Sequence, residues 1–259
     1  MSKKQDRNLS LSVSQNFLTS RRIIDRLINK TDLSSTDTVL EVGAGKGHIT
    51  KALSDKCKNV ISYEIDDRLF AKLKPQLNKN VRLYLCDFLK CSLPKCRYKV
   101  FANIPFSRTT EIMRKLTNTE NPPEIAWLIM EKGAAKRFCG LPNDNLQSLL
   151  LKPFFDLKII WHFDRNDFHP APNTDVVMLQ IKKKKPSDIK YYEKNDYTEF
   201  ISHSLKNGIY GSRALLTKKQ ISAALRLAKL AMIPKTGDIS YIQWLCLFRC
   251  RMKYKKHKS

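Results

Sequence analysis

The 259-residue sequence has little that would hold a metal ion or cross a membrane. Its seven cysteines include no C-x-x-C pair and its five histidines are scattered, so the sequence predicts no metal site. An odd number of cysteines without such a pattern indicates reduced, mostly buried thiols and a cytoplasmic protein. No apolar run approaches the length of a membrane span, and the first 30 residues show no continuous apolar segment of a signal peptide.

Acidic residues are also scarce. The sequence has 24 Asp and Glu against 48 Lys and Arg, a formal net charge of +24. This excess favours a polyanionic partner, nucleic acid first and an anionic membrane second. Hydrophobic residues make up 42% of the chain, enough to bury a sizeable core. The composition therefore predicts a soluble globular protein that binds nucleic acid.

Short apolar runs alternate with helical patterns over the first two thirds of the chain. Alternation of this kind predicts parallel βαβ units, with helices on both faces of the sheet. Before the first strand, Ser20 is expected to cap a helix. The predicted strands are Thr38–Val42, Val60–Glu64, Val81–Leu85, Tyr98–Ala102, Ile125–Met130, Ile159–Phe163 and Val176–Ile181.

A lysine run at 182–185, followed by Pro186, interrupts this pattern. Helices are expected beyond it over 191–205, 218–230 and 239–248. Residues 182–259 hold 19 Lys and Arg against 5 Asp and Glu, a net charge of +14. The sequence therefore predicts an α/β domain over 1–183 and a small basic helical domain over 184–259 that contacts phosphates.

The tetrapeptide Asn103-Ile104-Pro105-Phe106 follows a predicted strand and carries the groups needed to activate an adenine amine. The Asn103 side-chain oxygen and the Ile104 carbonyl, held by Pro105, can accept the two amine hydrogens as the nitrogen becomes tetrahedral. The Phe106 ring can stack on the base. The alternative is an ordinary strand end with Phe106 in the core.

A glycine loop follows the first strand, in the stretch Glu41-Val42-Gly43-Ala44-Gly45-Lys46-Gly47. Its G-x-G-x-G spacing departs from the G-x-G-x-x-G fingerprint of nicotinamide enzymes. Glu64 ends the second strand, where a carboxylate can bind both ribose hydroxyls, and Asp87 follows the third, where it can accept from an adenine amino group. Each acid alone can equally be a solvated strand end. Together they indicate an adenosine pocket that faces the tetrapeptide Asn103–Phe106, which we call the clamp. A pocket for adenosine beside a group that activates an amine indicates S-adenosylmethionine as the methyl donor.

These motifs make the chain resemble, along nearly its full length, the rRNA adenine-N6 methyltransferase superfamily and within it the Erm methyltransferases. Ser14–Leu18 resembles the N-terminal cofactor motif of that family, and Phe168-His169-Pro170-Ala171-Pro172 resembles its F-x-P-x-P loop. The resemblance implies a Rossmann-like S-adenosylmethionine-dependent domain and places Phe168 near the target base, although Phe168 can equally be a core aromatic. The cofactor residues that it implies are Asn16, Leu18, Gly43, Gly45, Glu64, Ile65, Asp87 and Asn103.

By the same resemblance, the expected reaction is methylation of one adenine N6 in protein-free or early-assembly 23S rRNA by a monomer, which gives macrolide resistance. Gly45-Lys46-Gly47-His48 and Leu216–Gln220 favour the Erm branch over the sister 16S rRNA dimethyladenosine transferases. Phe106 stands where many relatives carry Tyr, and stacking needs only the ring. A DNA adenine methyltransferase and a non-catalytic RNA-binding factor are the remaining alternatives, and the intact clamp argues against the second.

Overall fold

The computed structural model describes residues 16–234 and 238–256. The chain divides into two compact units: one comprises Met1–Ala135 and Asp156–Lys183, the other Lys136–Phe155 and Lys184–Ser259. The helical patterns expected from residue 184 onward fall in the second unit. That unit also contains 136–155, a segment that the sequence pattern assigned to the α/β domain.

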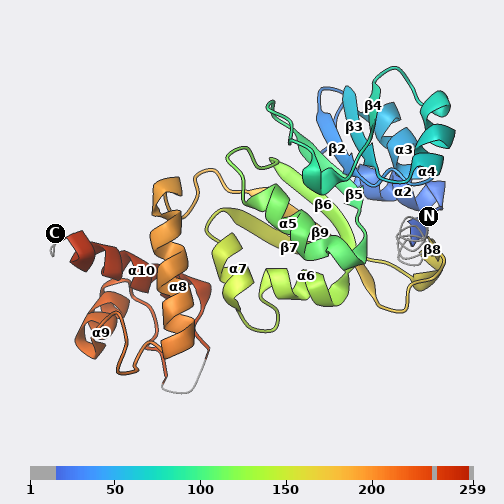
Figure 1. Ribbon diagram of the computed structural model, residues 1–259. Helices are drawn as coiled ribbons and strands as arrows, with labels where there is room; N and C mark the ends of the chain where they lie inside the picture. The colour runs from blue at the N-terminus through green and yellow to red at the C-terminus, as the bar shows by residue number, and fades with distance from the viewer. Residues whose placement is uncertain (1–15, 235–237, 257–259) are drawn as a thin grey trace, which may run out of the picture. The chain divides into compact units, whose positions relative to one another are not determined.

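The first unit is built on a seven-stranded sheet with the order β4-β3-β2-β5-β6-β9-β7 (Figure 1). The five strands from β4 to β6 run parallel, and β9 pairs antiparallel with β6. A separate two-residue ladder joins β1 to β8. The strands are β1 (Phe17–Leu18), β2 (Thr38–Val42), β3 (Asn59–Glu64), β4 (Val81–Leu85), β5 (Lys99–Asn103), β6 (Ile125–Glu131), β7 (Phe155–His162), β8 (Phe168–His169) and β9 (Val176–Lys183).

Helices α2, α3 and α4 gather beside the β2–β4 end of the sheet (Figure 1). The Ser20 side chain caps α2 by accepting from the Ile23 N–H, as the sequence predicts. The helices of this unit are α2 (Arg21–Asn29), α3 (His48–Lys56), α4 (Asp67–Leu73), α5 (Thr109–Thr117) and the start of α6 (Lys132–Cys139), with short 3₁₀ turns η1 (Lys74–Gln76), η2 (Phe88–Lys90), η3 (Phe106–Arg108) and η4 (Arg165–Asp167).

Strand β6 is buried on both of its faces. Ile125, Trp127 and Ile129 pack in one cluster with the apolar faces of α2 and α3. The alternate residues Leu128 and Met130 are also fully buried. A strand buried on both faces is what a parallel sheet between helical layers requires, so the predicted Rossmann-like α/β fold is confirmed.

Helices of the second unit surround a core of their own. Tyr197 and Phe200 on α8 pack with Trp244 and Phe248 on α10, edge to face in two of the contacts. The Tyr197 hydroxyl donates to the Leu149 carbonyl at 3.1 Å, which ties α7 into this core. The elements are α7 (Leu146–Leu151), η5 (Tyr191–Glu193), α8 (Lys194–Asn207), α9 (Lys218–Leu227) and α10 (Tyr241–Lys256).

Cysteine chemistry differs in one place from the sequence expectation. Cys86 and Cys91 are joined by a disulfide, whereas Cys57 and Cys139 are buried free thiols. Within the described ranges there is no group of three or more His, Cys, Asp or Glu that could hold a metal ion. None of the described helices is long and apolar enough to cross a membrane.

Candidate active site

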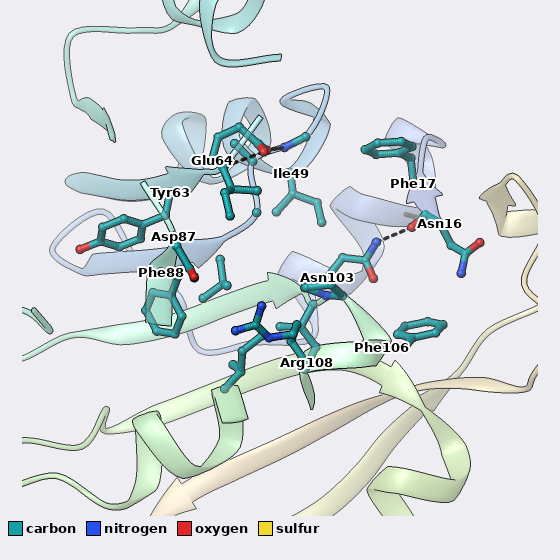
Figure 2. A pocket seen from close by; sticks show the side chains of 18 of the residues that line it. Asn16, Phe17, Ile49, Tyr63, Glu64, Asp87, Phe88, Asn103, Phe106 and Arg108 are labelled. Atoms are coloured by element: carbon teal, nitrogen blue, oxygen red, sulfur yellow. Dashed lines mark hydrogen bonds between the residues drawn. The ribbon is translucent and has the colours of Figure 1, made fainter. Parts of the chain in front are cut away.

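A pocket lies at the carboxyl ends of β2, β3, β4 and β5 (Figure 2). Strands β2 and β5 are neighbours in the sheet although β3 and β4 come between them in sequence, so the chain reverses its direction of winding there. Open α/β sheets bind ligands at such switch points. The sequence-predicted residues that line the pocket are Asn16, Leu18, Gly43, Gly45, Glu64, Ile65, Asp87, Asn103, Ile104, Pro105 and Phe106. Ser14 and Gln15 lie outside the described residues.

Two positions of the glycine loop, 45 and 47, have a positive φ and lie too close to a neighbouring side chain to carry a Cβ. Gly45 has φ +55°, and a Cβ there would lie 2.7 Å from the Phe17 ring. Gly47 has φ +81°, and a Cβ there would lie 2.2 Å from Leu73. Side chains at either position would therefore push the loop away from α4 or from β1.

Glu64 fixes this loop from the end of β3. Its Oε2 accepts from the Gly45 N–H at 2.7 Å, and its Oε1 accepts from the N–H groups of Ile65 and Asp66 at 2.8 and 2.9 Å (Figure 2). The side chain is 2% exposed. Each carboxylate oxygen has two lone-pair directions, so Oε1 is fully used and Oε2 can still accept from one hydroxyl of a ribose.

The third strand end supplies a second carboxylate. Asp87 Oδ1 accepts from the Leu89 N–H at 2.9 Å and caps the η2 turn. This contact turns the Asp87 side chain toward the pocket that Phe88 and Leu89 also line (Figure 2). Within the described chain no hydrogen bond engages Oδ2, which remains available to an amino group.

Asn103 is the last residue of β5, and its amide orientation is set by the N-terminal segment. The Nδ2 group donates to the Asn16 carbonyl at 2.7 Å (Figure 2). A carbonyl can only accept, so this bond assigns the nitrogen and leaves Oδ1 as the free end of the amide. Oδ1 is buried and has no hydrogen-bond partner among the described residues. A buried acceptor in this state favours a ligand that donates an N–H.

The two aromatic residues singled out from the sequence lie in different surroundings. Phe106 is half-buried: it lines the pocket and also packs against the edge of the main core. Phe168 is only 4% exposed, belongs to that core and lies 5.2 Å from Phe163 between ring centroids. Phe168 does not line the pocket in this structure, although β8 pairs it with Leu18, which does.

Sequence patterns missed several other lining residues. Lys46 lies over the Phe17 ring, 5.2 Å from its centroid. His48 starts α3, and burial, with Lys46 and Lys51 nearby, lowers its pKa, which favours the neutral imidazole. Arg108 enters from η3 and pairs with Glu111. Of these, only Lys46 and His48 carried a local signal, because they extend the glycine loop.

S-adenosylmethionine fits the groups present in the pocket. Glu64 and the free Asp87 oxygen offer acceptors for a ribose and an adenine amine. Ile65 is apolar yet 44% exposed beside them, which provides a surface for a base. An ideal Cβ on Gly43 would meet no atom within 4 Å, so the loop leaves open space at the pocket wall. The fold and this pocket define an S-adenosylmethionine-dependent methyltransferase.

Comparison with known proteins gives the family. The chain belongs to the ribosomal RNA adenine dimethylase family, whose model matches residues 7–231. It is 34% identical to an rRNA adenine N-6-methyltransferase of Lysinibacillus sphaericus, over 93% of this chain and 96% of that one. It is 33% identical to one of Enterococcus faecalis, over 97% of this chain and all of the relative.

Two solved structures share the fold across both units. The 23S rRNA methyltransferase ErmE superposes with a TM-score of 0.80 at 24% identity and covers 92% of this chain and 100% of its own. A dimethyladenosine transferase from Plasmodium falciparum superposes with a TM-score of 0.70 at 20% identity, covering 93% and 98%. The two branches of the family therefore have the same architecture, and the fold does not separate them.

Proposed function

We propose that this protein methylates N6 of one adenine in 23S rRNA in the cytoplasm, acting as a monomer, and so confers resistance to macrolide, lincosamide and streptogramin B antibiotics. The observation that carries the proposal is the buried, unpartnered Oδ1 of Asn103, which lies in the cofactor pocket next to Phe106. An exocyclic amine is the donor that this acceptor lacks.

The residues of the clamp act on the target amine by accepting and positioning. Asn103 Oδ1 accepts one amine hydrogen and the Ile104 carbonyl the other, which localises the nitrogen lone pair as the amine becomes tetrahedral. The Phe106 ring stacks on the base and fixes its angle of approach. S-adenosylmethionine would supply the electrophilic methyl group. The amine nitrogen bonds to the methyl carbon as the carbon–sulfur bond breaks, S-adenosylhomocysteine leaves, and the methylated nitrogen releases one proton to water. The target adenine has to leave its stack to reach this pocket.

Relatives and charge support rRNA as the substrate. The curated relatives that match this chain along nearly its full length are named rRNA adenine N-6-methyltransferases. The net charge of +24 fits a polyanion. A non-catalytic RNA-binding factor would have no use for Glu64, Asp87 and the clamp in one pocket. The Gly45–His48 loop and the Leu216–Gln220 segment support the 23S branch over the 16S dimethyladenosine transferases.

Methyl transfer from labelled S-adenosylmethionine to two substrates tests the assignment. We expect label in protein-free 23S rRNA, at N6 of a single adenine, and none in assembled 30S subunits. Label in the 30S particle alone would assign the chain to the 16S branch. Label in neither, with intact donor binding, would favour another nucleic acid, and duplex and single-stranded DNA are the next substrates to test.

A further inference from the structure

A second hollow lies wholly within the helical unit, between the segment that joins α8 to α9 and the last turns of α10. Its volume is about 640 Å³, within the range of about 300–1,000 Å³ that is usual for small-molecule sites. None of its described lining residues is acidic. Two cations, Lys218 and Arg251, line it together with the aromatic side chains of Tyr210 and Tyr254.

Among the described residues, neither cation of this hollow has a carboxylate partner. Over residues 16–234 and 238–256, no ion pair involves Lys218 on α9 or Arg251 on α10. Four of the six acidic side chains of the unit pair with other cations: Asp144 with Lys152, Asp188 with Lys184, Glu193 with Arg249 and Asp196 with Lys255. Because two cations and no acid are found among the described lining residues, the hollow favours an anion.

A close backbone turn and two side-chain hydrogen bonds to carbonyls stabilise the wall of the hollow. A Cβ on Gly211 would lie 2.3 Å from the Asn207 carbonyl oxygen, so the chain can turn this closely only with glycine there. The His203 ring bonds to the Arg213 carbonyl at 2.7 Å, and the Tyr210 hydroxyl donates to the Ile233 carbonyl at 3.1 Å. Because these bonds join the segment to α8 and to the chain after α9, the hollow is preformed.

We propose that this hollow binds one nucleotide of single-stranded RNA outside the target adenine. Its phosphate lies between Lys218 and Arg251, and its base stacks on Tyr254, a residue that is 40% exposed. Arg251 and Tyr254 are three residues apart on α10 and so lie on one face of it. An exposed ring beside two unpaired cations fits a nucleotide better than an acidic peptide. The inference rests on the proposed RNA substrate.

The first test measures the affinity of the full-length protein for a fluorescent 12-nucleotide single-stranded RNA. Replacing both cations, Lys218→Ala with Arg251→Ala, is expected to weaken binding about 10-fold and to flatten the salt slope by about 0.7, the value for one single-strand phosphate. The matched control is Lys206→Ala with Arg226→Ala, which removes one exposed lysine and one exposed arginine of the same unit that do not line the hollow. An equal loss of RNA affinity in the two double variants would mean that only the total positive charge matters, and it would overturn the proposed site.

A second variant pair tests the base. Tyr254→Leu is expected to weaken binding about 10-fold, whereas Tyr254→Phe retains it, since stacking needs only the ring. RNA carrying 5-iodouridine is expected to form a photo-crosslink within the peptide that contains Tyr254, and polyglutamate should not compete with it. No crosslink in the helical unit, or equal competition by polyglutamate, would overturn the proposal.

These measurements use neither the methyl donor nor methyl transfer. Failure of wild-type protein to methylate 23S rRNA would therefore remove the proposed function while leaving the nucleotide site testable. Conversely, normal methylation with unchanged RNA affinity in the Lys218 and Arg251 double variant would remove only the second site.

Discussion

Individual residues at the strand ends stabilise the fold and, in the proposed function, also take part in the reaction. Glu64 accepts three backbone N–H groups, so it organises the glycine loop besides facing the pocket. The Asn103 Nδ2 group donates to the Asn16 carbonyl, whereas its Oδ1 has no hydrogen-bond partner among the described residues. The residue types alone do not predict these hydrogen bonds, because Glu64 bonds to Gly45 and Asn103 bonds to Asn16, both distant in sequence.

Replacing Glu64 tests the cofactor pocket. Glu64→Ala removes charge-assisted hydrogen bonds that are worth about 1–3 kcal/mol in donor binding. We expect S-adenosylhomocysteine to bind about 10- to 100-fold more weakly by calorimetric titration, with a lower melting temperature because three loop N–H groups lose their acceptor. Asp67→Ala, which removes an exposed acid three residues on in the first turn of α4, is the control for binding and should leave the affinity unchanged. Unchanged affinity in a folded Glu64→Ala protein would exclude Glu64 from the pocket's function.

Replacing Phe106 tests stacking against packing. Phe106→Tyr keeps the ring and should retain most activity, whereas Phe106→Ala should lower kcat/KM about 10- to 100-fold, the scale of one base–aromatic stack. Phe106→Leu keeps apolar bulk for the neighbouring core but has no ring, so we expect it to resemble the alanine variant in rate and the wild type in stability. Wild-type rates with leucine would assign Phe106 to the core alone.

At the scale of elements, much of the sheet could be predicted from sequence. Apolar runs bounded by polar turns gave β2 and β4 with their observed limits, and β5 one residue early. The start of β7 at Phe155 was missed by four residues, because its first half alternates apolar and polar residues and lacks the continuous apolar run of its second half. The burial of Phe168 depends on the pairing of β8 with β1, two strands of two residues each that no periodicity reveals.

The glycine loop offers a matched comparison between two glycines. Gly43 and Gly47 have φ of +78° and +81°, so alanine strains the backbone at both, by about 1–2 kcal/mol. Only at Gly47 would the new Cβ also meet Leu73, at 2.2 Å. We expect Gly47→Ala to lower the melting temperature clearly more than Gly43→Ala. Equal decreases in melting temperature would mean that Leu73 on α4 moves aside and that the contact with the new Cβ costs no stability.

At the scale of the whole molecule, a buried carboxyl links stability to pH. Glu41 on β2 is 1% exposed, and its Oε2 accepts from Thr50 at 2.6 Å and Ser62 at 2.7 Å. Burial raises the pKa of Glu41 from 4.5 to about 8, against the opposing effect of these hydroxyls and with a smaller contribution from Glu64. The folded state therefore keeps a proton that the unfolded chain releases, so this contribution to stability is full below pH 4.5 and is lost as the pH rises toward about 8.

Urea unfolding of wild type and Glu41→Gln across this range measures the effect. Glutamine copies the neutral carboxyl, so its stability relative to wild type should rise from pH 5 to pH 8 and then level off. All other titrating groups cancel in this difference. A difference independent of pH would mean that the folded protein does not hold the Glu41 proton.

The central claim is that the unpartnered Asn103 oxygen receives the target amine, and single-turnover methylation of 23S rRNA at saturating donor tests it most directly. Losing one preorganised partner of a reacting group costs about 10²- to 10³-fold in rate. The account predicts a loss of that size for Asn103→Ala, while S-adenosylhomocysteine affinity, measured separately, falls far less. A folded Asn103→Ala protein that methylates at the wild-type single-turnover rate would contradict it.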